Sequence, residues 1–67
     1  MILKITEHTK FKMYEEGITE EMIKEAIKKG SKFKQTDGFL VVYKYYSVAY
    51  KTIGKNIYKI KTVYINR

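Results

Sequence analysis

The stretch that decides the fold is residues 32–43, which read KFKQTDGFLVVY. Asp37-Gly38 inside it is a strong signal for a tight β-hairpin turn, because glycine takes up positive φ angles at little steric cost. The flanking residues are rich in β-branched and aromatic side chains and contain no proline. This composition predicts two paired strands, over residues 32–36 and 39–45.

A second turn follows at Gly54-Lys55-Asn56. It predicts another hairpin, between strands over residues 48–53 and 57–65. Residues 39–53 would make a strand much longer than the usual length of about five or six residues. We therefore expect a break near residues 45–47, which gives four strands in the C-terminal half.

Two helices are predicted before the first hairpin, over residues 7–16 and 20–29. Each follows a threonine suited to cap its first turn, and each ends at a glycine. A short apolar run at residues 2–5 precedes them and predicts a further strand. The apolar stripes expected to face the core are Phe11, Tyr14 and Ile18 for the first helix and Met22, Ile23, Ala26 and Ile27 for the second.

These elements predict a single domain over residues 1–67. It belongs to the α+β class, in the order β-α-α-β-β-β-β, with an antiparallel sheet and two helices on one face. Because two short helices can cover only one side, the other face of the sheet should be open. With Asp37-Gly38 as a two-residue loop, the expected pairs are Thr36–Phe39, Lys34–Val41 and Lys32–Tyr43. This register predicts an open face that carries Lys32, Lys34, Tyr43 and Tyr45, and a core that receives Phe33, Leu40 and Val42.

The composition excludes several classes of protein. The chain has no cysteine and a single histidine, so it predicts neither a disulfide scaffold nor a metal site, and no motif indicates a cofactor. No stretch reaches the roughly 18 consecutive apolar residues of a membrane span, and no signal-peptide core follows the N-terminus. We therefore expect a cytoplasmic protein without a membrane partner.

The positive charge is concentrated in the predicted strands. Residues 1–30 hold six lysines and six glutamates, whereas residues 31–67 hold seven lysines and one arginine against Asp37 alone.

The strands of the last hairpin carry three lysines at odd-numbered positions, which are Lys51, Lys59 and Lys61, and alternation predicts that they share one face. Lysines interleaved with tyrosines suit a single-stranded nucleic acid, because ammonium groups meet phosphates and rings stack on bases. The alternative is a sheet whose lysines confer solubility and whose tyrosine hydroxyls face water. The expected nucleic-acid-binding residues are Lys32, Lys34, Tyr43, Tyr45, Lys51, Lys59 and Lys61.

The first helix places His8, Lys12 and Glu15 on one side by i, i+4 and i+7 spacing. An imidazole beside an ammonium group is the pair that cleavage of RNA would use. His8 would move a proton and Lys12 would stabilise the charge on the phosphorane. The alternative is an ordinary surface histidine.

Several motifs together resemble a known family. The chain has His8, Met13, Gly17-Ile18-Thr19 and, near its end, Thr62-Val63-Tyr64. This resembles the uncharacterised family of short domains that is grouped with the RelE-like and BrnT-like toxins, in the barnase–EndoU–colicin–RelE fold group. The similarity spans nearly the whole chain.

The resemblance implies a RelE/BrnT-like fold and metal-independent RNA cleavage by one member of a toxin–antitoxin pair. The matched positions are His8, Lys12, Thr62 and Tyr64, of which the last two are expected in the core. The chain has Lys12 and Glu16 where the family has arginine, and lysine lacks the bidentate fork with which arginine holds phosphate. The alternatives are a non-catalytic nucleic-acid-binding domain of the same fold and a module that docks a partner. The expected partners are RNA or another polyanion, an acidic antitoxin-like protein, or a second copy of the chain.

Overall fold

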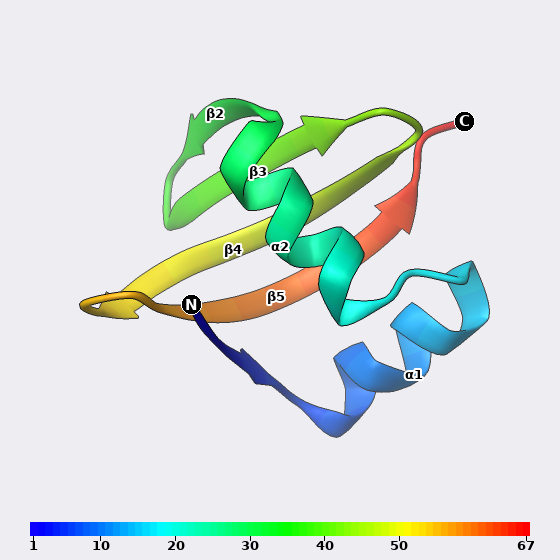
Figure 1. Cartoon of the computed structure of the whole chain (residues 1–67), viewed down its shortest axis with the longest axis horizontal. Helices are drawn as coiled ribbons and strands as arrows, with labels where there is room; N and C mark the ends of the chain where they lie inside the picture. Colours follow the sequence, from blue (N-terminus) through cyan, green and yellow to red (C-terminus); the bar gives the residue numbers. More distant parts are fainter.

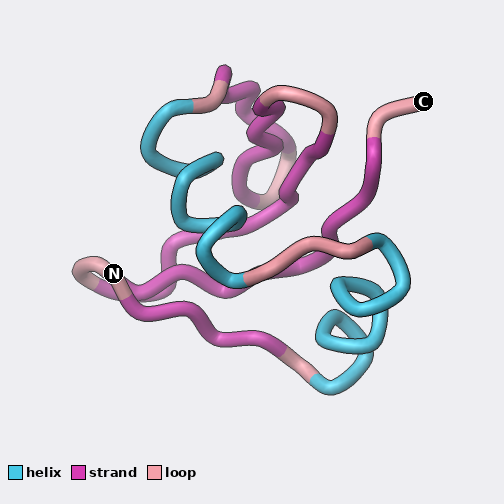
Figure 2. The backbone as a smooth tube through the Cα atoms, turned by 45° about the vertical axis from the view of Figure 1, so that its right-hand side comes forward, coloured by secondary structure: helices cyan, strands magenta, loops and turns pink.

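The computed structural model describes all 67 residues, and the order of its elements is the predicted one. Strand β1 (Ile2–Ile5) leads into helices α1 (Glu7–Glu16) and α2 (Glu20–Lys29). Four strands then complete the chain: β2 (Ser31–Gln35), β3 (Gly38–Tyr43), β4 (Tyr46–Gly54) and β5 (Ile57–Ile65). Figure 2 shows the chain passing through both helices between β1 and the remaining strands. Neither helix is long and apolar enough to cross a membrane.

The five strands form one mixed sheet in the order β1-β5-β4-β3-β2. The strands from β2 to β5 pair in antiparallel fashion, as predicted, but β1 runs parallel to β5. The expectation of a purely antiparallel sheet is therefore wrong. The parallel pair arises because the two helices carry the chain from β1 to β2 at the far edge of the sheet, from which β3, β4 and β5 return in alternating directions until β5 lies beside β1.

The helix ends follow the predicted capping chemistry. The Thr6 hydroxyl accepts a hydrogen bond from the main-chain nitrogen of Thr9, and the Thr19 hydroxyl accepts one from that of Met22. Gly17 ends α1 in the left-handed conformation, with φ of 71°. Both helices begin and end where the sequence places them.

The two helices take different positions on the sheet. Helix α2 lies over β3 and β4 and covers one face, whereas α1 lies along β5 (Figure 1). Strand β1 pairs only with residues 57–60 of β5. Side chains of α1 bond the next part of that edge: the Thr9 hydroxyl donates to the carbonyl of Lys61, and the Glu16 carboxylate accepts from the main-chain nitrogen of Ile65. The second helix confirms the expected face packing, whereas the first closes an edge.

This edge packing changes which side of α1 is buried. Thr9 and Met13 are its buried residues, whereas Phe11 and Tyr14, which were expected in the core, are 62% and 85% exposed. A helix beside a strand edge must supply polar groups to unpaired main-chain atoms. An apolar stripe therefore does not identify the buried side of this helix.

The core lies between α2, part of α1 and the covered face of the sheet. Its buried residues are Met13, Ile18, Ile23, Ala26, Ile27, Val41, Tyr46, Val48, Tyr50, Ile60 and Val63. The first hairpin turns at Thr36-Asp37, since Gln35 pairs with Gly38 and Lys34 with Phe39. The register is therefore shifted by two positions from the predicted pairs. Lys32, Lys34 and Tyr43 do share a face, but it is the covered one, because Val41 between them is fully buried.

Candidate nucleic-acid interface

The face of the sheet away from α2 is its open face. Residues paired across it form rows that cross several strands. One row runs Phe33–Leu40–Ala49–Thr62 and the next runs Ser31–Val42–Ser47–Tyr64. Phe33, Leu40 and Val42 are therefore on the open face, and their predicted place in the core is wrong. The alternation of residues in the sequence cannot show which side of these strands faces the core, because both the odd-numbered and the even-numbered residues include large apolar side chains.

Apolar and small side chains occupy the middle of this face, with an aromatic ring on each side. Ala49 and Ser47 are buried between their larger neighbours, even though no helix covers them. Phe33 on β2 is 55% exposed and Tyr64 on β5 is 36% exposed. The two rings lie at opposite margins of this face, and each offers an exposed surface on which an unsaturated ring system can stack.

A third row consists of lysines. Lys51 pairs with Lys59 on β5, and Lys59 pairs with Lys4 on β1. These three residues, the lysine row, lie side by side across β4, β5 and β1. Their Cα atoms span two strand spacings, about 10 Å. Like charges directly opposite one another destabilise a sheet, so this row is an unfavourable arrangement unless an anion lies against it.

Lys61 lies on the same face as the lysine row because of an irregularity in β5. Ala49 pairs with Thr62 whereas Tyr50 pairs with Ile60, so Lys61 is an extra residue in a β-bulge. A bulge changes the face on which the following side chains lie. Tyr58 and Ile60 consequently face the core, but Thr62 and Tyr64 lie on the open face. The expected place of Thr62 and Tyr64 in the core is wrong for this reason.

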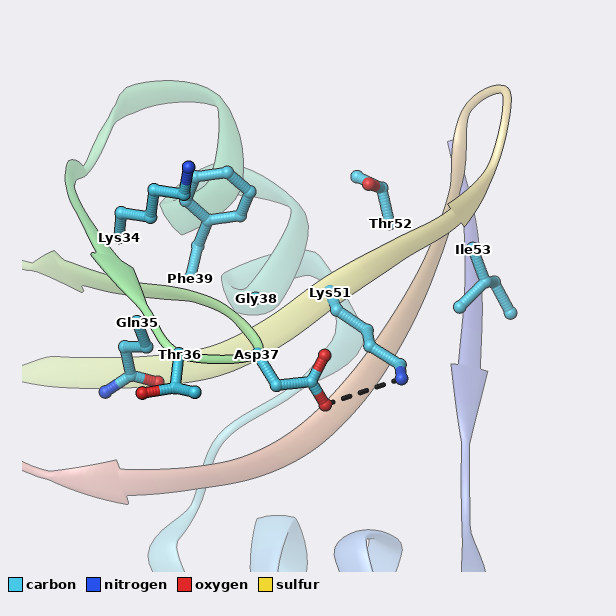
Figure 3. Close-up of a pocket in the computed structure, with 9 residues that line it drawn as sticks. All are labelled: Lys34, Gln35, Thr36, Asp37, Gly38, Phe39, Lys51, Thr52 and Ile53. Atoms are coloured by element: carbon cyan, nitrogen blue, oxygen red, sulfur yellow. Dashed lines mark hydrogen bonds and ion pairs between the residues drawn. The ribbon is translucent and has the colours of Figure 1, made fainter.

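Few acidic groups neutralise these lysines. The Asp37 carboxylate lies 3.5 Å from the Lys51 ammonium nitrogen and 3.7 Å from that of Lys61. Lys4 and Lys59 form no ion pair. A hollow of about 370 Å³ lies beside those two lysines, lined by Lys4, Ile5, Thr6, Ile53 and Lys59. A larger hollow of about 530 Å³ lies beside Asp37 and Lys51 (Figure 3). Both ends of the lysine row therefore have room for a ligand.

The structure brings together only part of the predicted binding set. Lys51, Lys59 and Lys61 share the open face, as their parity predicts. Lys32 and Lys34 lie on edge strand β2 and point to the side that α2 covers. They are exposed because α2 does not reach across this edge strand.

The two predicted tyrosines lie at the other end of the β3–β4 hairpin. The Tyr43 ring packs edge-on against Tyr46, with centroids 6.0 Å apart, and the Lys44 ammonium lies 5.2 Å from its centre. Tyr45 is exposed in the turn but also contacts Tyr46. Neither ring lies beside the lysine row.

Sequence reasoning missed the residues that complete this face. Lys4 belongs to the electrically neutral half of the sequence, and only the pairing of β1 with β5 brings it beside Lys59. The signal was present in the alternation of residues 2–5, where Lys4 stands between Leu3 and Ile5, which pack against the core. Phe33 and Tyr64 were missed because their faces were assigned incorrectly.

His8 and Lys12 flank the open face. On a helix with about 100° per residue, Met13 lies about 40° to one side of Thr9, whereas Lys12 and His8 lie about 60° and 100° to the other. Thr9 faces the β5 edge and Met13 lies in the core. The remaining direction, taken by Lys12 and His8, is that of the open face. The His8 side chain is exposed and forms no hydrogen bond or ion pair.

No protein-family model, curated protein sequence or solved structure shows a significant match to this chain. The molecule is an α+β domain with two helices and a five-stranded mixed sheet.

Proposed function

We propose that this chain is a small RelE/BrnT-like toxin-type domain that binds single-stranded RNA across the open face of its sheet. The observation that carries the proposal is the lysine row, in which Lys51, Lys59 and Lys4 are direct neighbours on three strands. Their mutual repulsion is relieved when phosphates lie between them. The sequence resemblance to toxin domains supports RNA as the polyanion.

The neighbouring rows suit the bases of such a strand. Phe33 and Tyr64 offer exposed rings at the two margins of this face. Base stacking on an aromatic side chain contributes about 1–3 kcal/mol and is independent of sequence. We therefore expect a binding mode with little sequence preference, in which phosphates follow the lysine row and bases lie towards the rings of Phe33 and Tyr64.

The test is a titration of the purified chain with a fluorescent oligouridylate at several salt concentrations. Binding should weaken with salt, with log K falling by about 0.7 per phosphate contact against log [salt]. A matching oligodeoxythymidylate tests the preference for RNA, and a duplex tests the preference for single strands. Absence of salt-dependent binding to the single strands would sink the proposal.

RNA cleavage is a second candidate, because His8 and Lys12 lie on the side of α1 that faces this surface. The exposed imidazole can take the proton from a 2′-hydroxyl as it attacks phosphorus, and can return it to the departing 5′-oxygen. Lys12 can stabilise the added negative charge. Incubation of RNA with the protein in the presence of a chelator tests this activity, since the proposed mechanism uses no metal.

An acidic antitoxin-like protein is the natural competitor for the same surface. Its carboxylates would meet the lysine row as phosphates do. Competition between a candidate acidic protein and oligouridylate distinguishes a shared surface from separate ones. Size-exclusion chromatography with light scattering separates such a complex from a homodimer.

A further inference from the structure

Asp37 holds two lysines at one end of the open face. Its carboxylate lies 3.5 Å from the Lys51 nitrogen and 3.7 Å from the Lys61 nitrogen. The Lys61 ammonium also donates a hydrogen bond to the main-chain oxygen of Asp37. Asp37 is the only acidic residue in residues 31–67, and Figure 3 shows its side chain directed at Lys51.

The three side chains differ in their exposure. The side chains of Lys51 and Lys61 are 35% and 34% exposed, whereas that of Asp37 is 66% exposed. The stems of the lysines are thus held against the sheet, and the carboxylate lies over them from the turn. Such exposed ion pairs contribute little to stability, so the carboxylate can leave while the two ammonium groups stay in place.

We propose that Lys51 and Lys61 form a phosphate clamp, which Asp37 occupies in the free protein and a phosphate of the bound strand occupies in the complex. This inference rests on the proposed function, since it assigns one phosphate position and its internal competitor. A phosphodiester carries one negative charge, as the carboxylate does, so the exchange replaces one anion with another. The hollow of about 530 Å³ beside Asp37 and Lys51 gives the displaced side chain or the incoming phosphate room.

The clamp differs from the other end of the lysine row. Lys59 and Lys4 have no carboxylate partner, so a strand binds there without displacing anything. A phosphate can bind Lys51 and Lys61 only when Asp37 leaves them. The lost ion pairs lower the net free energy that this phosphate contact adds to binding. Asp37 therefore weakens binding and reduces the number of counterions released.

The test compares Asp37→Asn with wild type in the oligouridylate titration. Asparagine has the shape of aspartate and is itself a common turn residue, so the hairpin should be kept, which a thermal unfolding curve checks. We expect affinity to increase by about threefold to tenfold and the salt slope to steepen by at most about 0.7, for the one phosphate at the clamp. The matched control is Glu25→Gln, which makes the same change in net charge. Glu25 lies on α2 and pairs with Lys44, 3.6 Å away, so its effect should stay below about twofold.

A double-mutant cycle tests whether the effect is local. In a Lys51→Gln/Lys61→Gln background, Asp37→Asn should give no gain, because the clamp has been removed. A gain that persists in this background, or a gain equal to that of Glu25→Gln, would overturn the clamp. Unchanged affinity in Asp37→Asn with normal wild-type binding would also overturn it and leave the proposed function intact. If no variant binds the oligonucleotide, the proposed function and the inference built on it both fail.

Discussion

The hydroxyl of Thr9 donates a hydrogen bond to the main-chain oxygen of Lys61, at 3.3 Å. This contact ties the first turn of α1 to the bulge in β5. Together with the bond from the Ile65 nitrogen to Glu16, it holds the helix that carries His8 and Lys12 beside the strand that carries the bulged lysine.

Thr9→Val should weaken this junction. Valine keeps the shape of threonine but leaves the Lys61 carbonyl without its partner at a site that is 2% exposed. We expect the free energy of unfolding to fall by about 1–2 kcal/mol, measured by chemical denaturation. Thr52→Val, at an exposed strand position, is the control and should change stability by less than about 0.5 kcal/mol. Equal stability of the two variants would contradict the role assigned to the Thr9 hydroxyl.

Lys59→Gln should weaken RNA binding without destabilising the fold. Lys59 stands between Lys51 and Lys4, so its removal takes away one phosphate contact and two repulsions. We expect affinity to fall by about threefold to tenfold, the salt slope to decrease by about 0.7, and the melting temperature to stay equal or rise. Lys28→Gln on α2 is the charge-matched control. Equal losses in both variants would indicate that only net charge matters.

Phe33→Ala and Tyr64→Ala should each reduce binding by an amount that does not depend on salt. Removal of one stacking ring costs about 1–3 kcal/mol of binding free energy. Parallel plots of log K against log [salt] would show that the phosphate contacts persist. Tyr14→Ala, at a ring that is 85% exposed on α1, serves as the control. A loss in the control as large as in the two test variants would show that Phe33 and Tyr64 are not stacking sites.

His8→Ala should greatly slow metal-independent RNA cleavage, because the proposed mechanism uses His8 to move the proton. The affinity for oligouridylate should remain within about twofold of wild type. Loss of a general acid–base group reduces the rate by about a hundredfold to ten-thousandfold. The measurement is a time course of RNA cleavage in chelator, with binding measured on the same preparation. Undiminished cleavage by the variant would assign the activity to another group or to a contaminant.

Tyr46→Phe should lower the free energy of unfolding at neutral pH. The free energy of unfolding of this variant should also fall less than that of wild type as the pH rises above about 10. The Tyr46 hydroxyl donates to the main-chain oxygen of Met22 at 2.8 Å, and its loss costs about 1 kcal/mol. Burial, with a smaller contribution from Glu25, raises the pKa of Tyr46 above its ordinary value. An unfolded tyrosine ionises near pH 10, and below that pH the Tyr46 side chain contributes fully to the free energy of unfolding. This contribution is lost as the pH rises through the higher pKa that Tyr46 has in the folded protein.

Denaturation curves at pH 7 and pH 10.5 test this dependence. The stability difference between wild type and Tyr46→Phe should narrow at the higher pH. Tyr45→Phe, at an exposed ring in the neighbouring turn, is the control and should follow wild type at both values. A difference that stays constant with pH would contradict the assigned titration.

The order and type of the elements could be predicted because they depend on local chemistry. Thr6 and Thr19 cap the helices, and Gly17 ends the first one as expected. The exact turn was harder, since Gly38 has φ of 107° but lies at the start of β3. A glycine signal indicates that a turn is near, and the pairing of Gln35 with Gly38 decides where it closes.

The open face could not be predicted in full because it depends on pairing and on the bulge. Alternation groups Lys51, Lys59 and Lys61 correctly, but it does not reveal that β1 adds Lys4 to them. It also cannot show which parity of β3 meets α2. The buried side of α1 escaped prediction because that side bonds strand edges through Thr9 and Glu16.

The bulge at Lys61 gives β5 two phases of alternation. Before it, even-numbered residues such as Ile60 face the core, and after it odd-numbered residues such as Val63 do so. Deletion of Lys61 would leave both faces of β5 as they are, because Ile60, Thr62 and Val63 would then alternate without interruption. Their partners Tyr50, Ala49 and Val48 on β4 would also stay the same. The bulge is thus an insertion that the fold tolerates, and what it adds to the molecule is one more ammonium group beside Asp37.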